Sequence, residues 1–129
     1  MLLDTQVLLW WLRDDRKLGR KARALIAEPT SDVSVSAVSI WEIAIKTALG
    51  KLDWRDGPST TLGSCVTDCG FAELPVTVPH AAAVRDLPAR HGDPFDRLLL
   101  AQAAHEGLRI LSADENLQRY DAAIIDATI

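Results

Sequence analysis

Acidic side chains stand at four separated points of the 129-residue chain, each beside a short apolar run: Asp4, Glu42, Asp96 and Asp114. Carboxylates that converge without basic partners repel one another strongly. A hard divalent cation such as Mg²⁺ or Mn²⁺ removes that repulsion, because such ions prefer oxygen ligands. A cation held in this way can generate hydroxide from water and stabilise charge on phosphate oxygens, so the acids suit phosphoester chemistry.

Each acid also fits a structural role. Asp4 and Asp114 could each cap the helix that follows them. Ser39 and Glu42 have the spacing of a capping box, and Asp96 could simply favour the positive end of its helix. Four acids at four separate element ends are harder to explain by capping alone, so we favour a shared site.

Short apolar runs alternate with helical stretches, which indicates an α/β fold with a mostly parallel sheet. We expect strands at 1–4, 32–36, 71–76, 109–112 and 123–125. We expect helices at 7–11, 19–27, 37–49, 58–69, 79–88, 93–107 and 115–119. If the first and fourth strands are neighbours, Asp4 and Asp114 meet at their carboxyl ends, where open α/β sheets bind ligands.

Local signals place several of these elements. Asp93 and Pro94 have the N-cap and first-position residue types that begin a helix. Pro75 predicts an edge position for its strand. Helical spacing places Ala22, Leu25 and Ile26 on one face of the helix at 19–27. In the helix at 37–49 the residues that recur at helical spacing are Val38, Trp41, Ile45 and Ala48.

Composition bounds the class of protein. Hydrophobic residues make up 48% and charged residues 25%, which indicates one globular domain, residues 1–129. A net charge of −4 argues against holding nucleic acid by a basic surface alone. Asp4 follows Met1-Leu2-Leu3 directly and no basic segment precedes it, so we expect no signal peptide, no membrane association and a cytoplasmic location. The pair Cys65 and Cys69 lacks further zinc ligands nearby and is expected to pack at a helix end.

Four stretches resemble the PIN-domain family, and within it the VapC-like toxins of VapBC toxin–antitoxin pairs: Leu2–Thr5, Val35–Lys46, His91–Ala103 and Leu111–Asp114. The resemblance spans nearly the whole chain in the expected order. It implies that metal-binding and catalytic acids fall on Asp4, Glu42, Asp96 and Asp114, supported by Thr5, Ser112 and Asp93. Asp93 ranks below Asp96, because its N-cap role already explains it.

The resemblance also implies a three-layer sandwich, with a five-stranded parallel sheet of order 3-2-1-4-5 between helices. It implies Mg²⁺- or Mn²⁺-dependent endonucleolytic cleavage of structured RNA, with tRNA or rRNA expected. A metal-activated water would attack in line and release the 3′ oxygen, leaving a 5′-phosphate. Members typically form homodimers and are silenced by a cognate VapB-like antitoxin whose C-terminal segment covers the acidic groove.

Other side chains could serve the site. Five basic residues could position phosphates, although each could equally be solvated or ion-paired, as Lys46 could be with Glu42: Arg13, Lys46, Arg90, Arg97 and Arg119. Tryptophans in helical stretches are expected in the core or on a dimer surface, whereas Trp54 lies in a loop-like stretch and stays open. The scattered His80, His91 and His105 indicate no nucleophile system.

Two alternatives remain. A phosphorylation-controlled receiver domain would have a similar size, but Asp14-Asp15 lies a helix away from the first strand and no Lys follows Ile125. A PIN fold that acts solely as a binding partner is also possible in principle, because a fold alone does not establish activity.

Overall fold

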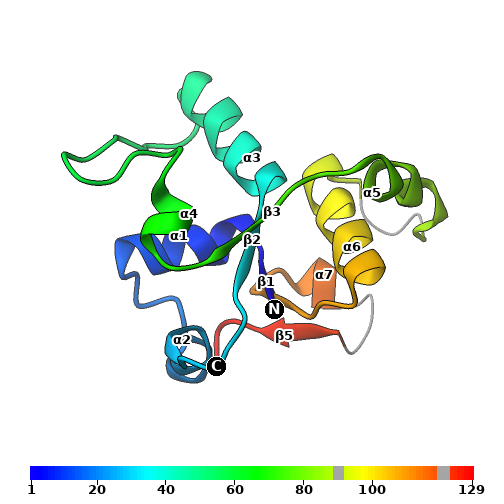
Figure 1. Ribbon diagram of the computed structural model, residues 1–129, viewed down its shortest axis with the longest axis horizontal. Helices are drawn as coiled ribbons and strands as arrows, with labels where there is room; N and C mark the ends of the chain where they lie inside the picture. The colour runs from blue at the N-terminus through cyan, green and yellow to red at the C-terminus, as the bar shows by residue number, and fades with distance from the viewer. Residues whose placement is uncertain (89–91, 119–122) are drawn as a thin grey trace.

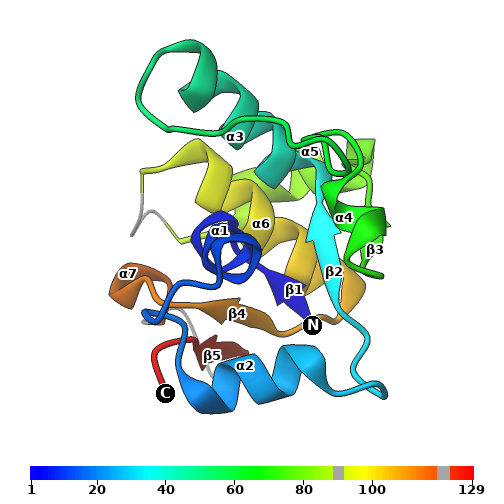
Figure 2. The ribbon, with the colours of Figure 1, turned by 90° about the vertical axis from the view of Figure 1, so that its left-hand side faces the viewer.

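The computed structural model describes residues 1–88, 92–118 and 123–129. Its parallel strands are β1 (Leu2–Leu3), β2 (Ser34–Ser36), β3 (Ala72–Leu74), β4 (Ile110–Ser112) and β5 (Ile124–Asp126). They form one five-stranded sheet of order β3-β2-β1-β4-β5, which confirms the expected order and the edge position of β3 (Figure 2). Receiver domains have the order 2-1-3-4-5 instead, so the sheet argues against that alternative.

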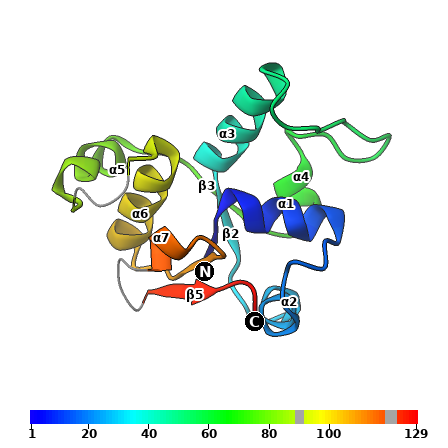
Figure 3. The ribbon, with the colours of Figure 1, turned by 180° about the vertical axis from the view of Figure 1, so that it is seen from behind.

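Helices connect the strands on both faces of the sheet. They are α1 (Thr5–Arg13), α2 (Arg20–Ala27), α3 (Ala37–Ala48), α4 (Cys65–Asp68), α5 (Val78–Ala83), the 3-10 helix η1 (Val84–Asp86), α6 (Pro94–Glu106) and α7 (Glu115–Gln118). Helices α1, α2 and α4 lie on one side, and α5 and α6 lie on the other (Figures 1 and 3). The predicted three-layer sandwich is therefore confirmed.

Alternation along the strands divides the core in two. Leu3 pairs in register with Val35 and Leu111, and all three pack in the core that contains α1 and α2. Their neighbours Leu2 and Ile110 point to the opposite face and pack with α6. Because β1 is buried on both faces, the residue that follows it is held at a fixed point of the sheet.

The helix expected at 58–69 is shorter than predicted, because only Cys65–Asp68 is helical. The carboxylate of Asp56 accepts hydrogen bonds from the Leu62 backbone at 2.9 Å and the Trp54 ring at 3.1 Å. These side-chain bonds offer the chain an alternative to the helix, and an irregular loop results.

The apolar residues that recur at helical spacing in α2 and α3 are not all buried. Trp41 is 57% exposed and Ala48 is also exposed, while Leu25 of α2 is 37% exposed. The residues of α3 that are buried are Val38, Ser39, Glu42 and Ile43. Two polar residues thus occupy the inner face of α3, beside α1.

Two expectations from composition can be compared with the structure. Cys65 is buried and Cys69 half-buried, at the start and the C-cap of α4, as expected for packing residues. Within the described ranges, no helix has both the length and the apolar character needed to cross a membrane.

A buried amide fixes α6 against the ends of two strands. Gln102 is fully buried; its Oε1 accepts from the Ser36 hydroxyl at 2.5 Å, and its Nε2 donates to the Pro75 carbonyl at 3.2 Å. Ser36 also caps α3 by accepting from the Val38 backbone at 3.0 Å. One network therefore sets α3 and α6, which carry Glu42 and Asp96, relative to β2.

Replacing this amide should destabilise the fold. Gln102→Leu leaves the Pro75 carbonyl and the Ser36 hydroxyl without their partner, which costs about 1–3 kcal/mol of unfolding free energy. Urea unfolding followed by circular dichroism measures the change. Gln6→Leu, on the exposed face of α1, is the control and should leave the midpoint nearly unchanged. An unchanged midpoint for Gln102→Leu would contradict the network's structural role.

Candidate active site

A cleft of about 590 Å³ opens where β1 and β4 end. The predicted acids and Asp93 all line it: Asp4, Glu42, Asp93, Asp96 and Asp114. The pairing of β1 with β4 brings the first and last of them together, the middle of α3 supplies Glu42, and the start of α6 supplies the others. The convergence expected from the strand order is therefore present.

Asp4 is the most buried of these acids, with 5% of its surface exposed. Its Oδ1 accepts from the Val7 backbone at 2.8 Å and caps α1, so the capping alternative is correct as well. Its Oδ2 accepts from the Ser112 hydroxyl. The two bonds fix the plane of the carboxylate at the end of β1.

Burial raises the pKa of Asp4 to about 7. The hydrogen bonds from Ser112 and Val7 lower it again in part, and the nearby charges of Asp96 and Asp114 raise it further. Three carboxylates thus interact electrostatically. In the absence of a cation, this crowding favours the protonated form of Asp4.

Ser112 links two of the acids. While its hydroxyl donates to Asp4, its oxygen accepts from the Asp114 backbone N–H at 3.0 Å. Asp114 in turn accepts from the Asn116 backbone at 2.8 Å, which confirms that it also caps α7. Ser112 is fully buried at the end of β4, so it holds the carboxylate of Asp4 and the backbone of Asp114 from within the sheet.

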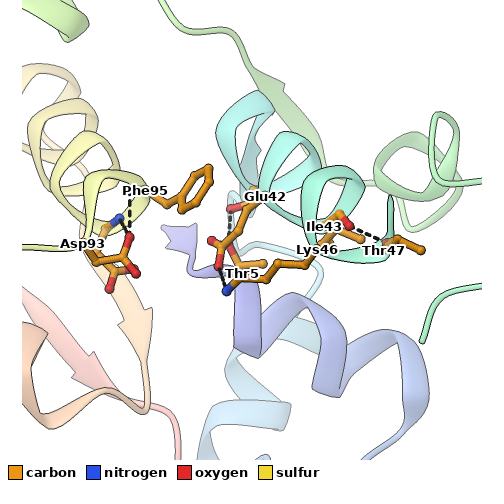
Figure 4. Close-up of polar contacts among 9 residues, drawn as sticks. Thr5, Glu42, Ile43, Lys46, Thr47, Asp93 and Phe95 are labelled. Carbon is orange, nitrogen blue, oxygen red and sulfur yellow. Dashed lines mark hydrogen bonds and ion pairs between the residues drawn. The ribbon is translucent and has the colours of Figure 1, made fainter. Parts of the chain in front are cut away.

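Glu42 is bound from two sides (Figure 4). The Thr5 hydroxyl lies 2.8 Å from Oε1, and Lys46, one turn on, contacts Oε2 at 2.5 Å. Ser39 lies 3.0 Å from the same Thr5 hydroxyl, so it supports Glu42 through Thr5. The capping-box explanation of Ser39 and Glu42 is wrong, because Ser36 is the N-cap of α3.

Asp93 and Asp96 complete the cleft from the start of α6. One oxygen of Asp93 accepts from the backbone of Phe95 at 2.8 Å and of Asp96 at 3.3 Å, as expected for the N-cap. The pKa of Lys46 is raised, first by its hydrogen bond to Glu42, and further by the charges of Glu42, Asp93 and Asp96. Lys46 therefore faces both walls of the cleft.

The donor set fits a hard divalent cation. Every predicted ligand is a carboxylate, and Asp4 interacts with two of the others through space. Oxygen ligands of this kind match Mg²⁺ and Mn²⁺ better than softer metals. The hydroxyls of Thr5 and Ser112 bind the carboxylates and so would orient them toward such an ion.

The basic residues that could position phosphates make different contacts. Arg13 donates to the Asp53 carbonyl at 2.6 Å, and Arg97 donates to the Pro88 and Val84 carbonyls, so both have structural roles. Lys46 lines the cleft, whereas Arg90 and Arg119 lie outside the described residues, as does His91. Sequence reasoning missed two further lysines that line the cleft, Lys17 and Lys51.

The four tryptophans also lie in different environments. Trp10 lines the cleft, and Trp11 packs against the core. Trp41 lies on the surface, with its ring edge-on to Phe95 at 5.3 Å. Trp54 packs on the core and donates to Asp56, so its loop position has a structural explanation.

A second group of ligand types lies on α5 and α6, where atoms of His80, His105 and Glu106 approach within 4.8 Å of one another. The Thr77 backbone donates to Nδ1 of His80 at 3.1 Å, so the ring proton sits on Nε2. Nε2 lies 2.7 Å from Glu106 and donates to it. His80 thus has no nitrogen left for a metal, and the group holds the capping box of α5 against α6.

A parallel sheet of this order, with carboxylates gathered beyond β1 and β4, defines a class of α/β domain built around an acidic cleft. The chain belongs to the PIN-domain family, which matches residues 1–123. It is 30% identical over 128 residues to Ribonuclease VapC22 of Mycobacterium tuberculosis, across 93% of this chain and 91% of the relative.

Solved structures share the fold at low sequence identity. A toxin–antitoxin complex from Klebsiella pneumoniae aligns with a TM-score of 0.64 and 15% identity, over 98% of this chain and 96% of the other. VapBC2 from Rickettsia felis, bound to a DNA fragment from the promoter, aligns with a TM-score of 0.62 and 10% identity, over 96% and 94%. The fold assignment thus has independent support.

Proposed function

We propose that this protein is a metal-dependent endoribonuclease and the toxin of a VapBC-type toxin–antitoxin module. The observation that carries the proposal is the gathering of Asp4, Glu42, Asp96 and Asp114 in one cleft of a PIN fold. The 30% identity to a ribonuclease over nearly the full chain supports RNA as the substrate.

The side chains of the site have different roles, according to their positions. Asp4, Glu42, Asp96 and Asp114 hold Mg²⁺ or Mn²⁺, which supplies Lewis-acid stabilisation of the phosphate and a more acidic water. Ser112 orients Asp4 and Asp114, and Thr5 orients Glu42. Asp93 begins α6 and so sets the position of Asp96. Attack by water in line with the departing 3′ oxygen leaves a 5′-phosphate.

Partners follow from the same assignment. The whole chain acts as one PIN domain in the cytoplasm, forms a homodimer and is inhibited by a cognate VapB-like antitoxin. Exposed apolar residues support contacts with other chains: Trp41, Leu49, Val76 and Val78. Light scattering of the purified chain tests the dimer, and a monomer at all concentrations would exclude it.

Cleavage of a mixed tRNA and rRNA pool tests the activity. We expect cuts with 5′-phosphate ends in Mg²⁺ or Mn²⁺ and none in EDTA, because the carboxylates need a cation to accommodate a phosphate. Comparison of the two metals identifies the preferred ion. Intact RNA in every metal, from folded protein free of antitoxin, would favour the alternative in which the fold is only a binding partner.

A further inference from the structure

The cleft contains lysines as well as acids. Lys17, Lys46 and Lys51 all line it, in a chain whose net charge is −4. Lys46 is already in contact with Glu42, whereas Lys17 and Lys51 are exposed. Within the described ranges, no carboxylate forms an ion pair with either exposed lysine. Within the described residues, the cleft therefore contains two lysines whose ammonium groups form no ion pair.

The lysines lie away from the acids along both helical walls. Asp4 caps the start of α1, a helix roughly 14 Å long, and Lys17 lies beyond the end of that helix. On the other wall, Glu42 lies inside α3 and Lys51 follows its end. Helices α1 and α3 diverge from the ends of β1 and β2 (Figure 3), so residues beyond the ends of these helices lie away from the strand ends where Asp4 and Asp114 meet.

Four apolar residues also line the cleft. Leu9 and Trp10 line it from α1, and Ile43 and Leu52 line it from the α3 side. Leu9, Trp10 and Ile43 are buried, so the side chains of this part of the cleft that suit a chain of phosphates are the lysines. A peptide would need a run of acidic residues to use the same lysines.

The neighbouring charges do not neutralise these lysines. Asp14 is held by Arg23 at 2.6 Å, and the Asp15 carboxylate accepts the backbone N–H of Lys17. The arginines Arg13 and Arg97 are bound to backbone carbonyls. Among the described residues that line the cleft, Lys17 and Lys51 are thus two cations that can offset a polyanion.

We infer that Lys17 and Lys51, with Lys46 at the inner end, bind the phosphates of the RNA strand on one side of the scissile bond. The inference rests on the proposed ribonuclease function and deepens it, because it assigns the side chains that hold the substrate. The lysines bind without taking part in the reaction at phosphorus.

The test is RNA binding by the double variant Lys17→Ala/Lys51→Ala in an Asp96→Asn background, with EDTA, using fluorescence anisotropy of a labelled oligouridylate. Each phosphate contact with single-stranded RNA contributes about 0.7 to the slope of log K against log salt, so the slope should fall by about 1.4. At about 0.1 M salt that change corresponds to roughly 25-fold weaker binding.

The matched control is Arg20→Ala/Lys21→Ala, which removes the same charge from exposed positions of α2 outside the cleft. In the catalytically intact chain, the lysine pair should raise KM for RNA and leave kcat nearly unchanged, as expected for uniform binding. If the two double variants show equal slopes, the inference is wrong. If the unsubstituted chain cuts no RNA, the nuclease proposal fails, and the slopes still decide whether the lysines bind phosphate.

Discussion

Asp96→Asn should abolish RNA cleavage while leaving the fold intact. Asp96 lines the cleft, and its charge acts on both Asp4 and Lys46, on opposite walls. Removing a carboxylate that holds a cation should cost more than removing one that orients a ligand, so we expect a loss above about 100-fold. The rate of cleavage at saturating Mn²⁺ measures it, beside thermal unfolding of the same sample.

A second variant controls for the loss of one negative charge. Asp86→Asn removes an exposed carboxylate of η1 that does not line the cleft, and its activity should equal that of the unsubstituted chain. Asp96 lies in the first turn of α6, so its loss costs about 0.3–1 kcal/mol through the helix dipole, too little to unfold the chain. Full activity of a folded Asp96→Asn protein would remove Asp96 from the proposed site.

The start of α6 shows what the sequence predicts well. Asp93 and Pro94 have residue types that act through local backbone geometry, so they specify a helix start without knowledge of the rest of the fold. The sequence also predicts the parallel sheet, because β1 is buried on both faces and is therefore apolar throughout. If β1 and β4 are neighbours, the sequence also predicts that the acids that follow them, Asp4 and Asp114, meet at one edge of the sheet.

The inner face of α3 shows why the rest could not be predicted. Periodicity assumes that polar residues face water, but Ser39 and Glu42 face inward because Thr5 and Lys46 bind them. The contacts with Thr5 join residues more than 30 positions apart on different helices. Trp41 is displaced to the surface as a result. The lysines at the open end of the cleft were missed for the same reason, since only packing of α1 beside α3 places them there.

Asp4→Asn should have opposite effects on activity and on stability. In the folded chain the pKa of Asp4 is raised from 3.8 to about 7, chiefly by burial. Without metal, the folded state therefore binds a proton more tightly than the unfolded state. The associated stability is fully present below about pH 4 and is lost as the pH rises through 7. Asparagine carries no charge, so the variant should not show that loss.

The size of the stability difference follows from the shift in the pKa of Asp4. One pKa unit corresponds to about 1.4 kcal/mol, so the metal-free variant should be more stable than the unsubstituted chain at pH 8 by a few kcal/mol. The asparagine oxygen can still accept from the Val7 backbone and keep the cap of α1. Asp4→Ala, which loses that cap, should be less stable than Asp4→Asn by about 1 kcal/mol.

Urea unfolding in EDTA at pH 5 and pH 8 measures these differences, and RNA cleavage in Mn²⁺ is assayed on the same samples. Added Mn²⁺ should stabilise the unsubstituted chain at pH 8 and leave Asp4→Asn unchanged, because a ligand stabilises only a state that binds it. A metal-free chain of equal stability at both pH values would show that burial does not raise the pKa of Asp4. With the expected result, the site's carboxylates lower the stability of the empty fold, and cation binding offsets that cost.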